Sequence, residues 1–337
     1  MEEGRRKERI DRGIKVRTSG LYAISGWPEL LYLIFPRFIL IAGMLSLPFV
    51  FSVAPYWRRV VCIVCIYAML SLAFDFLANF VGLINLGSSF FIGVGGYLAA
   101  IMNGYLGLPP ILSIPIATFL GAAISTLLIL PCLPLRGIYF AIVTLMYPLI
   151  FEKLIQAFNI LGGTNGIMGL DGFPNSWWET YTALIMVLVV LFGLRRLVNE
   201  DVGLVLRGVK DNDQAVRASG ISVTFCKALA VFIASAIGCF AGAFLSHLYM
   251  WAGLSLFALD FSIMPIAATV IGGGGTLVGA LIGSFILVPL SELLRSFGTL
   301  RVVFYSLVLT AFIIFKSEGL MVYAQRKYHQ FERWVKV

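Results

Sequence analysis

Residues 262–293 read SIMPIAATVIGGGGTLVGALIGSFILVPLSEL. The stretch is long and apolar enough to cross a bilayer, yet four consecutive glycines, Gly272 to Gly275, stand near its middle. Each glycine inside a helix costs about 1 kcal/mol relative to alanine, so a continuous helix would lose several kcal/mol here. The stretch therefore predicts two shorter helices joined by a glycine turn.

The composition excludes a soluble domain. Hydrophobic residues make up 60% of the 337 positions and charged residues 12%, with a mean hydropathy of +0.94. A soluble protein carries about 25% charged residues, so lipid must be the solvent of this chain. Because only helices and closed barrels satisfy backbone polar groups in lipid, and alternating strand patterning is absent, we expect an all-α polytopic membrane protein.

Basic residues gather in three places that predict the topology. Seven of the 25 lie in the first 20 positions, six lie from Arg195 to Lys227, and five lie from Lys316 to the end. Such clusters mark the cytoplasmic flanks of membrane spans, so the net charge of +8 reflects orientation and no nucleic-acid partner is expected. The predicted regions are a cytoplasmic N-terminal arm at 1–36, a transmembrane region at 37–320 with a cytoplasmic loop at 198–227, and a cytoplasmic tail at 321–337.

The apolar runs between these clusters set the number of crossings. They lie at 38–54, 59–84, 86–104, 111–134, 138–159, 182–197, 228–250, 262–293 and 302–317. Six runs separate the first two clusters, and this even number lets each run cross once. Three separate the second cluster from the third, so one of them must enter and leave on the same face. The glycine-broken run 262–293 is the candidate, as a re-entrant hairpin that opens outward, with Arg295 and Arg301 outside. We expect about eight crossings and eight to ten helices in all.

A weaker version of the same break precedes the run 86–104. Asn85-Leu86-Gly87-Ser88-Ser89 is a small polar turn before a glycine-rich helix, as Gly272 to Thr276 is before another. Two interrupted segments, one in each half, are typical of transporters built from two related halves. Broken helices expose backbone polar groups, which membranes tolerate only against protein or a water-lined cavity. We therefore expect a pathway beside both breaks. In the second break, Gly279 and Gly283 form a Gly-x-x-x-Gly pattern, which allows close helix packing.

Asp75 is the prominent charge inside a predicted span. It lies four residues before Asn79, so the two side chains share a helix face. An intramembrane carboxylate suggests function, but Asp75 can equally serve to bond Asn79 or a neighbouring helix. A proton-driven carrier needs several such groups in relay, and the chain offers one. The five cysteines and two histidines form no metal-ligand pattern, so no metal site is expected.

The loop between Lys210 and Lys227 is polar and rich in charge. Gln214 to Ser219 favour a helix of about two turns, with Asp211 or Asn212 as its N-cap and Gly220 as its stop. A helix this short is not stable alone, so we expect it to be ordered by docking on a partner. The chain has no Gly-x4-Gly-Lys-Ser/Thr pattern, and energy from ATP would have to come from another subunit.

Five stretches carry a family resemblance, in order along residues 75 to 290. They are Ile84-Asn85-Leu86-Gly87 through Tyr97, Leu135-Arg136-Gly137 through Leu145, Gly162-Gly163-Thr164-Asn165-Gly166-Ile167, Val209 to Gly220, and Ile271 to Gly283. Together they resemble the permeases of ABC importers for branched-chain amino acids, the M-type subunit in particular. Gln214-Ala215-Val216-x3-Gly220 is similar to the Glu-Ala-Ala-x3-Gly coupling loop of such permeases.

The resemblance implies partners and site residues. The partners would be two cytoplasmic ABC ATPases that bind ATP and Mg, a related H-type-like permease subunit and an external solute-binding protein, acting on a small-molecule substrate across the cell membrane. This chain would hold no cofactor and have no catalytic residue. Contact with an ATPase would fall to Asp211, Asn212, Gln214, Ala215, Arg217, Ala218 and Gly220. The translocation path would run beside Asp75, Asn79, Asn85, Gly87, Ser88, Thr144, Gly272, Gly273, Gly275 and Thr276.

Several positions depart from the family pattern. Gln214 stands where Glu is usual, Asp75 where Asn is usual, and Ser88 where His or Gln is common. Pro148-Leu149 stands where the family often has Gly-Glu. The hypothesis is a permease subunit of an ATP-driven importer for amino acids, most readily branched-chain ones. The alternatives are an ABC permease for urea, amides, nucleosides or sugars, an ion-coupled secondary carrier, and a structural membrane subunit.

Overall fold

A computed structural model describes residues 41–50, 54–135 and 137–298, together with Phe38 and scattered positions between 300 and 324. The predicted N-terminal arm, Arg136, Arg301 and most of both the run 302–317 and the tail lie outside the described residues. The chain falls into two units, 1–44 and 45–337. The described residues of the first unit are helical, and everything below concerns the second unit.

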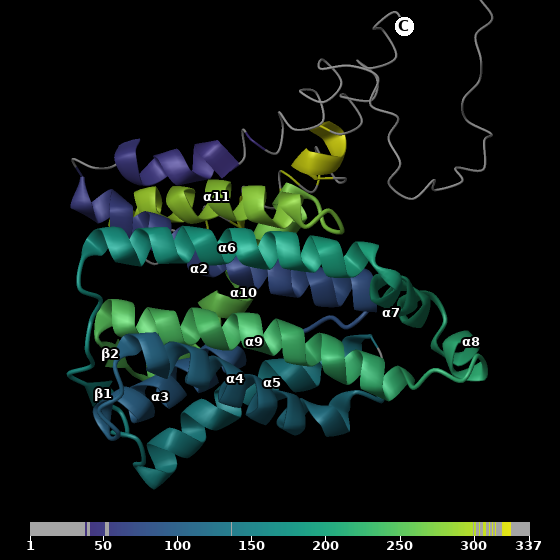
Figure 1. Cartoon of the computed structure of the whole chain (residues 1–337), viewed down its shortest axis with the longest axis horizontal. Coiled ribbons are helices and arrows are strands. Elements are labelled where there is room, and N and C mark those ends of the chain that lie inside the picture. Colours follow the sequence, from purple (N-terminus) through teal and green to yellow (C-terminus); the bar gives the residue numbers. More distant parts are fainter. Residues whose placement is uncertain are drawn as a thin grey trace, which may run out of the picture. The chain divides into compact units, whose positions relative to one another are not determined.

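Helices make up almost all of the described structure (Figure 1). The α-helices are α2 (Pro55–Asp75), α3 (Ser88–Gly104), α4 (Pro110–Ile129), α5 (Ile138–Phe158), α6 (Ser176–Asn199), α7 (Asp201–Asp211), α8 (Asp213–Ala218), α9 (Val223–Tyr249), α10 (Asp260–Gly272) and α11 (Val278–Leu293). A π-helix, η2 (Phe76–Val81), continues α2, and three short 3-10 helices are η3 (Leu130–Cys132), η4 (Leu254–Phe257) and η5 (Leu294–Phe297). Two short strands, β1 (Ile167–Met168) and β2 (Trp251–Ala252), pair antiparallel.

The prediction of an all-α polytopic membrane protein is confirmed. Six helical segments in the described part of the chain are long and apolar enough to span a bilayer: Pro55–Val81, Pro110–Cys132, Ile138–Phe158, Ser176–Asn199, Val223–Tyr249 and Leu254–Gly272. The predicted total of about eight crossings and the relation between two halves stay predictions.

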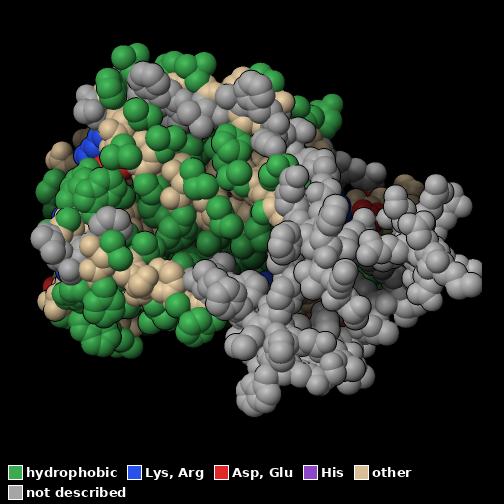
Figure 2. All heavy atoms as spheres, turned by 90° about the horizontal axis from the view of Figure 1, so that it is seen from above, with side chains coloured by type: hydrophobic (Ala, Val, Ile, Leu, Met, Phe, Trp, Pro, Cys, Tyr) green, Lys and Arg blue, Asp and Glu red, His purple; other side chains and the backbone are tan. Residues whose placement is uncertain are grey.

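The spans differ in what surrounds them. In the most apolar window of each span, 89% of the residues of Pro55–Val81 are buried, against 28% in Ile138–Phe158. Large apolar side chains such as Phe119 and Leu127 of α4 are exposed. Figure 2 shows hydrophobic side chains over most of the described surface on one face. The span that begins with α2 is therefore an inner element, while α4 and α5 present apolar surface suited to lipid or another membrane protein.

The glycine turn separates α10 from α11, as predicted. An ideal Cβ at Gly272 would lie 1.8 Å from the carbonyl oxygen of Gly279, and one at Gly283 would lie 1.9 Å from that of Ala268. Only glycine permits this contact, because a side chain at either position would overlap backbone atoms that cannot yield. The interpretation of Gly279 and Gly283 as a site of close helix packing is therefore confirmed.

The hairpin opens away from the end of the bundle that carries α7 and α8, here named the α8 end. Asp260 at the start of α10 and Glu292 near the end of α11 line one cavity together with Tyr249, the last residue of α9. The tyrosine hydroxyl of Tyr56, at the start of α2, donates a hydrogen bond to the Glu292 carboxylate. The start of α10 and the end of α11 therefore lie at the opposite end of the bundle, where α2 begins and α9 ends.

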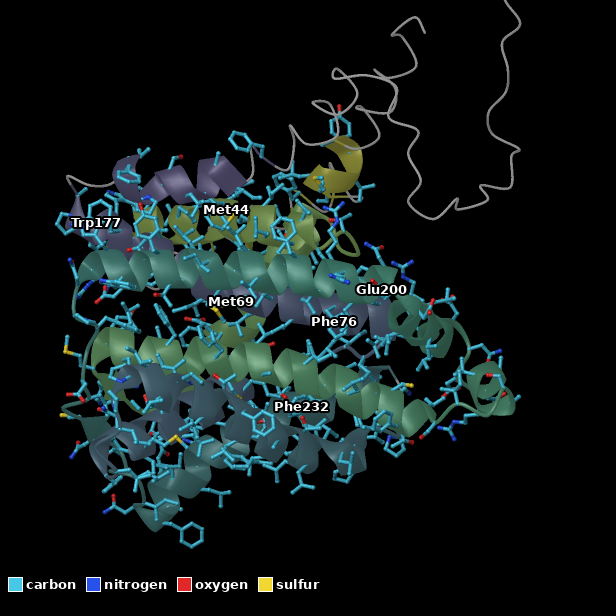
Figure 3. All side chains as sticks on the ribbon, in the orientation of Figure 1. Met44, Met69, Phe76, Trp177, Glu200 and Phe232 are labelled. Carbon is cyan, nitrogen blue, oxygen red and sulfur yellow. The ribbon has the colours of Figure 1, made fainter. Side chains whose placement is uncertain are left out.

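The described residues also place the two termini of α6 and residue 321 along the bundle. Trp177 and Glu200, which mark the two termini of α6, lie on opposite sides of the molecule (Figure 3). Met321 and Thr276 line one cavity with Arg195, so the chain has returned to the α8 end by residue 321. The return crossing through 302–317, which the odd number of apolar runs predicts, falls mostly outside the described residues and stays a prediction.

Candidate functional site

A buried carboxylate holds the glycine turn. Asp75, with an exposed fraction of 0%, ends α2. Its Oδ1 accepts hydrogen bonds from the Gly275 amide and the Asn79 side-chain amide, both at 2.6 Å. Its Oδ2 accepts one from the Leu277 amide at 2.9 Å. Three N–H donors thus compensate for the burial of the carboxylate, so Asp75 bonds Asn79, as one of the alternatives predicted, and also bonds the glycine turn.

Thr276 completes the turn. Its hydroxyl donates to the Gly273 carbonyl at 2.8 Å and accepts from the Gly279 amide at 2.9 Å. The threonine therefore satisfies backbone groups that the glycine break would otherwise leave without partners. Asp75 and Thr276 together fix the turn from two sides.

The π-helix η2 links this turn to the surface of the bundle. Phe76, its first residue, lies toward the side of the molecule that carries Glu200 (Figure 3). The carbonyl of Asn79, in the middle of η2, accepts a hydrogen bond from the Lys210 ammonium at 2.8 Å. Lys210 belongs to α7, so a continuous set of hydrogen bonds runs from α7 to the hairpin. We name this set the Asp75 network: Lys210, Asn79, Asp75, Gly275 and Leu277.

The second predicted break is also tied to its neighbours. The Leu86 amide donates to the Thr144 hydroxyl at 3.1 Å, and the Gly87 amide donates to the Asn85 side chain at 3.0 Å. Asn85 and Ser88 are buried, with exposed fractions of 3% and 4%. The structure therefore brings Asn85, Gly87 and Thr144 together, in a group bound to α5.

A serine pair connects this break to the hairpin. The Ser89 amide donates to the Ser262 hydroxyl at 3.0 Å, and the Ser262 hydroxyl lies 3.0 Å from the Ser89 hydroxyl. Ser262 lies in the first turn of α10. The hairpin thus contacts the start of α3 at one end and the end of α2 at the other, so the predicted break at 85–89 adjoins the hairpin that contains the glycine break.

A cavity of about 210 Å³ adjoins the glycine turn at the α8 end. Gly275 and Thr276 line it together with two arginines, Arg195 and Arg207. The Arg207 guanidinium lies 5.4 Å from the centroid of the Phe80 ring, a cation–π arrangement. This cavity lies beside the glycine break, where a translocation path is predicted, and the path itself stays a prediction; the two arginines were not among the predicted residues.

The predicted two-turn helix is present as α8. The Asn212 side chain accepts hydrogen bonds from the amides of Gln214 at 3.1 Å and Ala215 at 3.2 Å, so Asn212 rather than Asp211 is the N-cap. Gly220 follows the helix with a φ of +85°, a conformation that favours glycine. All seven predicted contact residues are solvent-exposed: Asp211, Asn212, Gln214, Ala215, Arg217, Ala218 and Gly220.

The sequence reasoning missed α7, which precedes α8. Its Gly203, Leu206 and Val209 are buried at a spacing of three residues, which is the periodic signal of a helix lying on the bundle. The side chain of Val216, half-buried, approaches α7 at Gly208. A second cavity of about 390 Å³ lies beside the α7–α8 joint and is lined by residues such as Gly82, Gly137 and Gln214. The exposed helix therefore rests on α7 next to a hollow at the surface of the bundle.

Comparisons with known proteins identify the family of the chain. A family model described as branched-chain amino acid transport system / permease component matches residues 57–316. The high-affinity branched-chain amino acid transport system permease protein LivM of Salmonella typhimurium is 29% identical over 287 residues, which cover 76% of this chain and 68% of that protein. The LivM protein of Escherichia coli is 27% identical over 315 residues, which cover 84% of this chain and 74% of that protein. A probable branched-chain amino acid transport permease protein LivM of Methanocaldococcus jannaschii is 27% identical over 218 residues, which cover 57% of this chain and 62% of that protein. No solved structure matches the chain.

Proposed function

The chain belongs to the family of branched-chain amino acid transport permease components, and from this premise we propose that it is one membrane subunit of an ATP-driven importer of branched-chain amino acids. The observation that carries the proposal is the exposed, capped helix α8, which rests on α7 and is connected through the Asp75 network to the glycine-broken hairpin. A transport subunit without a P-loop needs such a connection, because its energy arrives from outside the chain.

The proposed partners follow from the same premise. Two cytoplasmic ATPases would bind ATP and Mg and contact α8 through Gln214, Arg217 and their exposed neighbours. A related permease subunit would complete the pathway, and an external solute-binding protein would deliver the substrate. The multi-pass chain would lie in the cell membrane with the α8 end and both termini in the cytoplasm.

The proposed role of this chain is mechanical. A partner that binds α8 differently in two states shifts α7 with it, since a ligand changes an equilibrium only through differential contacts. Lys210 moves with α7 and pulls on the Asn79 carbonyl of η2. A π-helix in a membrane span is suited to such a step, because π segments are frequently found at functional sites. The displacement then reaches Gly275 and Leu277 through the Asp75 carboxylate.

Substitution of Gly220 tests the proposal. A non-glycine residue in the left-handed conformation costs roughly 1–2 kcal/mol, so Gly220→Val should displace the end of α8 and lower ATP-driven leucine uptake about tenfold. The measurement uses vesicles that hold the complete complex and records uptake and ATP hydrolysis together. We expect hydrolysis to continue while uptake falls.

Gly107→Val is the matched control. Gly107 also has a positive φ and open space around it, but it lies in the connection between α3 and α4 at the opposite end of the bundle. Equal losses of uptake in the two variants, or undiminished uptake in Gly220→Val, would contradict the coupling role. Uptake by this chain alone, driven by an ion gradient without nucleotide, would instead establish a secondary carrier.

A further inference from the structure

A cavity of about 210 Å³ lies at the end of the bundle opposite α8, between α2, α9, α10 and α11. Of its twelve lining residues, three are aromatic, four are polar or charged and five are aliphatic, among them Ile66, Leu245, Met264 and Val288. These four side chains are almost fully withdrawn from solvent, with exposed fractions of 0%, 2%, 6% and 4%. These buried aliphatic side chains therefore form an apolar floor for the cavity within the bundle.

Charged groups of both signs stand at its mouth. Asp260 begins α10, and Glu292 and Arg295 lie at and just beyond the end of α11. The Arg295 guanidinium donates to the Glu292 carboxylate at 2.9 Å, and their side chains are 64% and 15% exposed. The guanidinium thus reaches solvent, while the carboxylate stands nearer the aliphatic floor.

The glycine hairpin supplies two of the four walls. Met264 belongs to α10 and Val288 to α11, and the same two helices meet at the glycine turn held by Asp75. A change in the packing of α10 against α11 therefore alters the cavity and the turn together. The cavity is therefore partly formed by the α10–α11 hairpin, which is the element that the Asp75 network contacts.

We infer that this cavity is a binding site, open to the outside, for a free zwitterionic amino acid with an aliphatic side chain. The inference rests on the proposed function and names where this chain meets its substrate. Arg295 pairs with the substrate carboxylate, Asp260 and Glu292 face its ammonium group, and the branched side chain enters the space beside Met264 and Val288. Small-molecule sites have this composition, with an apolar cavity and a few convergent polar groups.

The size of the cavity gives the decisive experiment. Met264→Phe and Val288→Phe each fill part of the floor, so a branched side chain is excluded while a methyl group still fits. In vesicles with the complete complex, we expect leucine uptake to fall about tenfold relative to alanine uptake, since pockets discriminate side chains of different size by such factors. Met264→Ala enlarges the floor and should raise phenylalanine uptake relative to leucine uptake.

Two neighbouring positions provide matched controls. Ile263 and Ile286 lie on α10 and α11 but are 45% and 44% exposed on the outer surface. Ile263→Phe and Ile286→Phe should leave the ratio of leucine to alanine uptake unchanged. An unchanged ratio in the cavity variants, or an equal change in the controls, would overturn the assignment.

The charged mouth gives an independent readout. Arg295→Gln should reduce leucine uptake several-fold at low substrate concentration, and Arg295→Lys should restore most of it because the positive charge remains. Leucinamide has no carboxylate for Arg295 to bind. It should therefore inhibit leucine uptake to the same extent in the Arg295→Gln complex and in the Arg295→Lys complex. Equal competition by leucinamide and leucine against the wild-type complex would overturn the role of Arg295.

The outcomes separate this inference from the function on which it rests. If the wild-type complex transports no aliphatic amino acid, the proposed function fails. If it transports them and the cavity variants keep its size preference, the function stands and the cavity is not the site.

Discussion

The two ends of the α10–α11 hairpin are held in opposite ways. At the glycine turn, the Asp75 carboxylate is fully buried and receives three N–H donors, two of them from the turn itself. At the open end, the Glu292 carboxylate is partly exposed and bonds Arg295 and Tyr56 on the rim of a cavity. A buried charge whose hydrogen bonds are satisfied fixes a structure, whereas a rim charge stays accessible to a ligand. Asp75 therefore fixes the glycine turn in place and acts as its anchor, whereas Glu292 at the open end remains available to contact a ligand.

Removal of the anchor should have the largest effect. Asp75→Ala leaves the Gly275 and Leu277 amides and the Asn79 side chain without their acceptor, and each unsatisfied buried group costs about 1–3 kcal/mol. We expect the purified chain to unfold at a clearly lower temperature, as measured by a thermal scan in detergent.

Two substitutions sharpen this result. Asp75→Asn keeps one side-chain oxygen as an acceptor and should lose less stability than Asp75→Ala. Glu292→Ala removes a carboxylate from the open end and should lower the unfolding temperature least of the three. If Glu292→Ala proved as destabilising as Asp75→Ala, the distinction between anchor and rim would be wrong.

A change beside the anchor should have an intermediate effect. A methyl group at Gly272 overlaps the carbonyl of Gly279, so Gly272→Ala forces α10 and α11 apart and should cost about 1–3 kcal/mol. The control is Gly193→Ala in α6, where a Cβ meets no atom within 4 Å. Thermal scans of the two variants give the comparison, and equal stability would show that the hairpin tolerates a wider spacing.

The smallest effect on stability, with a larger one on transport, is expected at the outer end of the Asp75 network. Lys210→Met removes one donor to the Asn79 carbonyl and should change the free energy of unfolding by about 1 kcal/mol. Uptake per ATP hydrolysed should nevertheless fall, because the link between α7 and η2 is cut. Lys210→Arg retains a donor and should preserve this ratio, and an unchanged ratio in Lys210→Met would exclude Lys210 from coupling.

Local patterns predicted much of the architecture. Hydropathy predicted the helical membrane fold, and four consecutive glycines predicted the break in 262–293. The pair Asp211 or Asn212 and the later Gly220 marked the two ends of α8, because capping is decided by residues within one turn, and the structure selects Asn212 as the N-cap. Helix α7 was missed because it is short and its apolar residues lie between charged ones.

The sequence by itself determined which segments enter lipid, where one of them breaks, and which short helix stays in water, because burial in lipid and helix capping depend on neighbouring residues. Only the tertiary structure decided what Asp75 does, since its partners Gly275 and Leu277 lie 200 and 202 positions along the chain. The same holds for the cavity walled by Ile66, Leu245, Met264 and Val288. A cavity and a shared hydrogen bond arise when distant helices pack together, and no local pattern specifies which helices will meet.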